Sequence, residues 1–191
     1  MAIAVLKVEL EDTELPVCRV LEVPLDIRLD RLHLAIQAAM GWKNQHLYDF
    51  TAGRSARWAE PDPDFEDDME RPSKATLADL LAAAGGRSAF YTYDFGDDWR
   101  HRLTVAGTHD PAPGVAYPRL TGCTGRCPPE DVGGMPGFEE FLRVMADPSD
   151  AEHEDLIDWH GGPFDPAAAD SPARARALQA LAQKWAPRKP G

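Results

Sequence analysis

The sequence predicts an α+β fold in a single domain, residues 1–191, in which helices pack on a mixed or antiparallel sheet. Two observations carry this prediction. Apolar residues alternate with a period of two at residues 4–10, 17–23 and 89–105, and these strands follow one another as neighbours along the chain, as in hairpins. Apolar residues recur every three or four positions at residues 29–40 and in the last third of the chain, as in amphipathic helices.

The opening third reads as strand, strand, helix, strand. Residues 4–10 place four apolar side chains on one face, and residues 17–23 alternate in the same way, with Arg19 on the apolar face. The helix over residues 29–40 is followed by Gly41 at the position that helix ends favour. Residues 46–50 form the third predicted strand.

An acidic loop over residues 60–72 comes next. Its acidic side chains and prolines indicate an exposed segment, and their spacing does not fit an EF-hand. A short helix follows, with Thr76 as its cap and Gly85 and Gly86 at its end.

Residues 89–105 predict a hairpin with a three-residue turn, Gly96 to Asp98. In that register Tyr93 faces His101, Tyr91 faces Leu103, and Asp94 pairs with Arg100 on the other face. The turn requires Asp98 in the left-handed conformation. The chain is then rich in turns as far as Pro129, before helices at residues 137–146, 155–160 and 172–185 and a basic tail at 187–191.

Composition narrows the class of protein. The net charge of −12 repels phosphate, so we expect no direct binding of duplex DNA. The chain lacks a membrane-length apolar run and a signal peptide, so we expect no membrane partner. Cys18, Cys123 and Cys127 cannot all pair, which favours a reducing compartment, the cytoplasm.

Four motifs, in order, make the chain similar to the plasmid pRiA4b ORF-3-like family. They are residues 36–42 (IQAAMGW) with His46 and Leu47, residues 93–99 (YDFGDDW) with His101, residues 127–131 (CPPED) with Gly133 and Gly134, and residues 158–166 (DWHGGPFDP). The resemblance implies an α+β, MM3350-like fold with a mixed sheet. Some members are labelled as TnpR-type passengers of insertion elements, which implies an association with mobile elements but no chemistry. The chain lacks the nucleophile and clustered arginines of a recombinase.

The hairpin turn and the strand after it contain residue types that often take part in catalysis or metal binding. Asp97, Asp98 and His101 are the types that bind metals or transfer protons, but turns also favour Asp, and the predicted register directs His101 to the aromatic face.

The cysteines offer a second candidate. Cys123 and Cys127 have zinc-hairpin spacing, yet a second ligand pair could come only through the fold, from histidines 101, 109, 153 or 160, so two reduced thiols are the simpler interpretation. Cys127 is a poor nucleophile, because two prolines follow it and Glu130 and Asp131 would raise its pKa. We therefore expect no catalytic residue, metal ligand or cofactor.

The polar residues of these motifs predict one acidic crevice for a ligand or partner. The hairpin tip, the loop at residues 127–131 and the end of the helix at Trp159 would bound it, and Arg100, Arg102, Arg126, a cation or a basic ligand would balance its charge. The predicted crevice residues are Asp94, Asp97, Asp98, Trp99, His101, Cys127, Glu130, Asp131, Trp159 and Asp165.

Two functions remain open. The first is a non-catalytic binding or accessory module for an unknown protein or small molecule, working through the aromatic hairpin and the acidic loop. The alternative is a metal-assisted hydrolase or nuclease that uses Asp97, Asp98, His101, Glu130 and Asp131.

Overall fold

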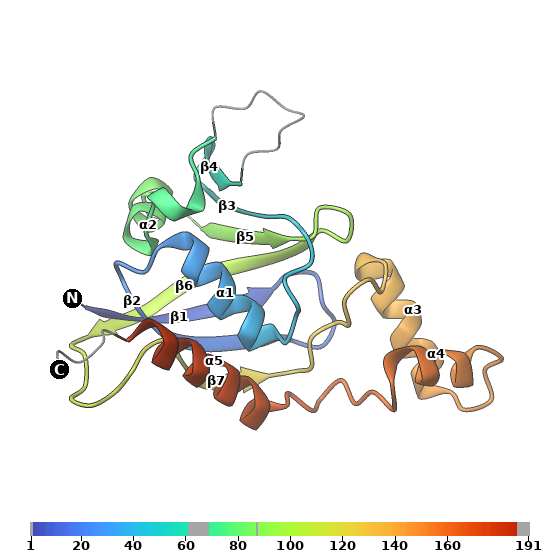
Figure 1. The fold of residues 1–191 in the computed structure, drawn as a ribbon. Helices are drawn as coiled ribbons and strands as arrows, with labels where there is room; N and C mark the ends of the chain where they lie inside the picture. Colours follow the sequence, from blue (N-terminus) through green and yellow to red (C-terminus); the bar gives the residue numbers. More distant parts are fainter. Residues whose placement is uncertain (1, 61–68, 87, 187–191) are drawn as a thin grey trace.

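Seven strands form one sheet in the order β4-β3-β5-β6-β1-β2-β7, and every neighbouring pair is antiparallel (Figure 1). The computed structural model describes residues 2–60, 69–86 and 88–186. The strands are β1 (Ile3–Leu10), β2 (Cys18–Pro24), β3 (Tyr48–Ala52), β4 (Ala56–Ala59), β5 (Ala89–Tyr93), β6 (Trp99–His109) and β7 (Arg119–Thr124). The helices are α1 (Leu29–Met40), the short 3₁₀ helix η1 (Pro72–Lys74), α2 (Leu77–Ala84), α3 (Gly134–Ala146), α4 (His153–His160) and α5 (Ser171–Trp185). The predicted α+β class is confirmed.

The core lies between one face of the sheet and the helices. In β1 the side chains of Leu6 and Val8 are fully buried, and Leu32 and Ile36 of α1 pack in the same core. Helix α5 lies beside α1 and against β7 (Figure 1). The opposite face carries ion pairs such as Arg119 with Glu22, whose charged atoms lie 2.6 Å apart. The period-two pattern thus gives a sheet with one buried and one polar face.

Helix α1 ends where the sequence predicts. Gly41 adopts a left-handed φ of 96° and donates its N–H to the carbonyl of Gln37. The chain then turns Trp42 inward, where its side chain is 7% exposed and its Nε1 donates to the carbonyl of Pro128 at 3.0 Å. The end of α1 is thereby tied to the loop that follows β7.

The predicted register of the β5–β6 hairpin is wrong by two residues. Tyr93 pairs with Trp99 and Tyr91 with His101, so the turn contains five residues instead of three. A shift of two residues keeps every side chain on its predicted face, which is why the aromatic face is still buried. Asp94 leaves the strand at a φ of 58° and does not oppose Arg100.

The longer turn has a local cause. The Oδ1 atom of Asp94 accepts from the backbone N–H groups of Gly96 and Asp97, at 3.0 and 3.4 Å, which closes the chain on itself before the strand resumes. Asp98 takes the left-handed conformation that was expected of it, with a φ of 54°. Phe95 lies in the turn and is 45% exposed.

Two edge strands were not predicted, β4 and β7. Strand β7 pairs with β2 within the segment that its prolines and glycines mark as turn-rich, and its weak apolar alternation gave no strand signal. Most of the acidic loop, residues 61–68, and the basic tail, 187–191, lie outside the described residues. In the part of the chain that the structure describes, no helix has the length and apolarity to span a membrane.

Candidate functional site

The loop after β7 lies against both the hairpin tip and the end of α1. The backbone N–H of Gly133 donates to Oδ2 of Asp97 at 3.3 Å. A Cβ atom on Gly134 would lie 2.8 Å from the carbonyl oxygen of Asp97, so only glycine fits there. The structure therefore brings together two of the three segments that were expected to bound a crevice, the hairpin tip and the loop after β7.

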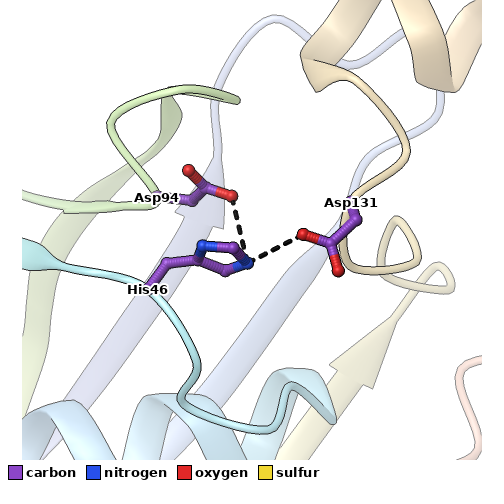
Figure 2. A group of neighbouring side chains, drawn as sticks. All are labelled: His46, Asp94 and Asp131. Carbon is purple, nitrogen blue, oxygen red and sulfur yellow. Dashed lines mark ion pairs between the residues drawn. The ribbon is translucent and has the colours of Figure 1, made fainter.

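Three side chains from separate segments meet at this junction (Figure 2). Nε2 of His46, in the α1–β3 loop, lies 2.9 Å from Oδ1 of Asp131 and 3.5 Å from Oδ2 of Asp94. The Asp94 side chain is 13% exposed, whereas that of Asp131 is 61% exposed. Among the described residues, these three form the only group of His, Cys, Asp and Glu side chains close enough together to hold a metal ion.

Glu130 fixes the loop next to this group. Its Oε1 accepts from the hydroxyl of Tyr93 at 2.7 Å, and its Oε2 accepts from the backbone N–H of Lys43 at 3.0 Å. Burial, together with the neighbouring Glu130 carboxylate, raises the pKa of Tyr93, so the hydroxyl stays a neutral donor. The position of Asp131 is thus determined by its neighbour's contacts.

A pocket of about 390 Å³ opens beside the junction, between the end of α1, the loop after β7, the end of α4 and the start of α5. Aromatic side chains of Trp42, Trp159 and Phe164 line it. Its basic lining residues are Arg19, Lys43, Arg126, His160 and Arg174, and its acidic ones are Glu130, Asp131 and Asp170. The predicted crevice is therefore not purely acidic.

Arg19 is the unusual member of this lining, because it is 1% exposed. Its Nε donates to the carbonyl of Ala39 at 2.8 Å, and its Nη1 donates to those of Cys18 and Thr124 at 2.8 and 2.7 Å. None of the ion pairs formed among the described residues includes it. The guanidinium is hydrogen-bonded, but its charge has no carboxylate partner in the part of the chain that is described.

Two other arginines of the pocket, Arg174 and Arg126, already contact neighbouring side chains. Arg174 pairs with Asp170 at 2.9 Å and lies so close to Gly41 that a Cβ there would meet its guanidinium. Arg126 lies over the ring of Phe164, 4.6 Å from the centroid. Neither a cation–π contact nor an exposed ion pair prevents these groups from binding an anion as well.

Cys127 lies at the wall of the pocket as an unreactive thiol. Burial raises its pKa to about 11, although the nearby Arg19 and Arg174 oppose this shift. Its Sγ accepts from Nη2 of Arg19 at 3.0 Å and lies 3.1 Å from Sδ of Met40. A raised pKa of Cys127 was expected from Glu130 and Asp131, whereas desolvation is its main cause. Cys123 donates to the carbonyl of Ala169, and all three cysteines are free.

The predicted crevice residues separate into four groups. Asp94, Glu130 and Asp131 lie at the junction with Asp97 beside them, and Cys127 and Trp159 line the pocket with Glu130 and Asp131. Trp99 and His101 lie inside the core, 1% and 0% exposed, because the hairpin's aromatic face is the core face.

Asp98 and Asp165 are exposed and lie outside the pocket lining, and Asp165 accepts from the backbone N–H of Ala167. Arg100 and Arg102, expected to balance the crevice, bind Glu11 on the polar face of the sheet.

No role for His46 or for Arg19 was predicted from the sequence. His46 stands at the start of a predicted strand, and nothing near it in the sequence announces the two carboxylates that it meets. Arg19 did carry a signal, since an arginine on the apolar face of a strand is rarely buried without a specific partner.

Comparison with known proteins shows which family the chain belongs to. Residues 2–173 match the family described as plasmid pRiA4b ORF-3-like protein. An uncharacterised protein, y4hQ of Sinorhizobium fredii (strain NBRC 101917 / NGR234), is 42% identical over 182 residues, which cover 95% of this chain and 93% of the relative. The crystal structure of MM3350 from Methanosarcina mazei Go1, a protein of unknown function, superimposes with a TM-score of 0.79 at 31% identity and covers 90% of this chain and 96% of that one. The chain belongs to the plasmid pRiA4b ORF-3-like family.

Proposed function

We propose that the protein is a binding module for a small anionic molecule, which enters the pocket between α1, the loop after β7 and α5. The observation that carries the proposal is Arg19, a buried cation at the pocket lining without a carboxylate partner among the described residues. A buried charge without a counter-charge costs free energy, and a bound carboxylate or phosphate would offset that cost.

The rest of the lining supports the same class of ligand. Arg126 and Arg174 line the pocket with Arg19, so an anion would meet several guanidinium groups. Trp42 and Trp159 give the pocket apolar surface for a ring or chain attached to the anionic group. The ligand class is therefore a small organic phosphate or carboxylate. The hairpin and acidic loop that the sequence favoured as the binding surface do not enter this proposal.

The proposal extends to the cellular setting. We place the protein in the cytoplasm, in keeping with its three free cysteines. An association with mobile elements, which the family resemblance implies, would describe where the gene travels and is compatible with any small ligand.

Isothermal titration with pyrophosphate and with citrate at low salt tests the pocket. We expect one of the two to bind in a 1:1 ratio, and we expect Arg126→Gln and Arg174→Gln each to weaken binding by about tenfold, the cost of one charge-assisted hydrogen bond. Arg143→Gln is the matched control, because this exposed arginine pairs with Glu140 and Asp150 away from the pocket lining. The absence of binding by both anions, or equal losses in all three variants, would refute the proposal.

A second candidate function, metal-assisted hydrolysis of a bound phosphoester, is favoured by one observation. Asp131 belongs both to the pocket lining and to the group with His46 and Asp94. This group differs from the set first expected, since His101 is buried in the core and Asp98 is exposed at the turn. Cleavage of bis(p-nitrophenyl) phosphate in the presence of Zn²⁺ or Mn²⁺, lost in Asp131→Asn, would support it, and unchanged cleavage in that variant would exclude it.

A further inference from the structure

We propose that His46, Asp94 and Asp131 form a binding site for a divalent transition-metal ion at the edge of the pocket. The three side chains come from the α1–β3 loop, the β5–β6 turn and the loop after β7, and they point toward one another (Figure 2). The inference does not depend on the anionic ligand, because it concerns a different set of atoms.

The distances fit a shared ion. Nε2 of His46 lies 2.9 Å from one carboxylate oxygen and 3.5 Å from the other, and all three atoms lie within 4.8 Å of one another. Ligands bound at about 2.0–2.2 Å to one ion are about 2.9–3.5 Å apart, whether the geometry is octahedral or tetrahedral. Both carboxylate oxygens therefore already lie at the distance of a neighbouring ligand from the imidazole nitrogen.

A direct ion pair explains the geometry less well. Nε2 of His46 is shielded from solvent, yet it forms no hydrogen bond with a described residue, although one carboxylate oxygen lies 2.9 Å away and another 3.5 Å away. An ion placed among the three atoms would satisfy the nitrogen and both oxygens at once. The buried nitrogen without a hydrogen-bond partner is thus the observation that separates the two explanations.

Neighbouring contacts hold two of the ligands in place. Oδ1 of Asp94 accepts two backbone N–H groups of the turn, which leaves Oδ2 directed at His46. Glu130 holds the loop that carries Asp131 through its contacts with Tyr93 and Lys43. Such outer contacts are typical of metal sites, where they orient the ligands.

The ligand set indicates which ion. Imidazole nitrogen favours Zn²⁺ and other transition ions over Ca²⁺ and Mg²⁺, and two carboxylates add the charge that a divalent ion requires. Three protein ligands leave at least one position for water or for an oxygen of a bound molecule. Because Asp131 also lines the pocket, that open position would lie at the pocket's edge.

The test uses the full chain, expressed without a histidine tag, stripped with chelator and titrated with Zn²⁺ and Co²⁺. We expect one ion per chain, a rise in melting temperature on binding, and a Co²⁺ spectrum without thiolate charge-transfer bands. Asp131→Asn and His46→Asn should each weaken Zn²⁺ binding by more than about tenfold, since even outer contacts of metal ligands are worth that much. His109→Asn, which removes an exposed histidine near Glu22, should bind as the unaltered chain does.

Three results would overturn the proposal. The first is that neither ion binds stoichiometrically. The second is undiminished binding in Asp131→Asn and His46→Asn, and the third is a thiolate band with Co²⁺. Either of these last two results would place the ion at another site. Because Asp131 is 61% exposed, the metal-free Asp131→Asn protein should melt like the unaltered chain, which keeps loss of binding distinct from loss of fold.

Discussion

At the scale of single residues, the buried histidines are the clearest case of environment deciding chemistry. Burial lowers the pKa of both His33 and His101 to about 4. His33 lies 2.8 Å from the hydroxyl of Tyr91 and 2.5 Å from Oδ1 of Asn44, which is consistent with a neutral ring that donates to Asn44 and accepts from Tyr91. Protonation would remove that acceptor and place a charge in the core.

We therefore predict that the free energy of unfolding decreases as the pH is lowered from about 6.5 to about 4. The unfolded histidines bind a proton near pH 6.5 and the folded ones only near pH 4. The unfolded chain therefore carries more protons in between, so unfolding becomes easier as the pH falls from 6.5 to 4. Each histidine contributes up to about 1.4 kcal/mol per pH unit across this window.

Urea unfolding at pH 7.5 and 5.0 checks this expectation. His101→Phe keeps an aromatic ring beside Trp42 and Tyr91 but removes one titrating group. The loss of stability on acidification should therefore be smaller in this variant by about 1 kcal/mol or more. An identical pH dependence in both proteins would show that His101 does not govern the acid limb.

At the scale of elements, the hairpin tip and the loop after β7 act as one unit. Gly134 makes this possible, since it combines a left-handed φ of 66° with the close approach to Asp97. Trp42 adds the end of α1 through its bond to Pro128. The positions of the candidate metal ligands thus depend on contacts between the hairpin tip, the loop after β7 and the end of α1.

We predict that Gly134→Ala destabilises the protein more than Gly161→Ala does. Both glycines have a positive φ, so both substitutions cost about 1 kcal/mol in backbone strain. Only the Cβ at position 134 meets backbone, whereas that at 161 meets open space, and forcing atoms into a packed contact costs about 1–3 kcal/mol more. Chemical denaturation of the two variants measures the difference, and equal losses would mean that the loop can move away freely.

The sequence predicts those features of these elements that apolar periodicity determines. Apolar periodicity determines which face a side chain takes, so α1 and the buried face of the hairpin were predicted correctly. Periodicity does not determine which residues pair across a turn, and the Asp94 contacts in the turn shifted the register by two. Edge strand β7 has little apolar alternation, so its residues were predicted as part of a turn-rich segment. The meeting of His46 with Asp131 is set by packing alone, which no local pattern records.

At the scale of the whole molecule, the net charge of −12 does not show how the charged side chains are distributed. On the polar face of the sheet, Arg102 and Arg119 are paired with Glu11 and Glu22 at 2.6 Å. The pocket is lined by Arg19, Arg126 and Arg174 together with its aromatic walls, and by acidic side chains at its edge. A pocket can thus attract a small anion while the surface as a whole repels a polyanion.

From this arrangement we predict weak or absent binding of duplex DNA. Phosphate backbones need several free Lys and Arg side chains on one face, and the arginines of the sheet face are already engaged. A gel shift at about 150 mM salt, where screening is strong, should show no submicromolar complex. A tight complex under those conditions would contradict the assignment of a small ligand.

The central claim is that a small anion binds beside the buried Arg19. Arginine side-chain resonances of ¹⁵N-labelled protein, followed during titration with the anion that binds in calorimetry, report this contact most directly. We predict saturable shifts of the Nε–Hε signals of Arg19, Arg126 and Arg174, while the signal of Arg143 stays in place. Shifts confined to exposed arginines such as Arg143, with Arg19 unchanged at saturation, would contradict the account.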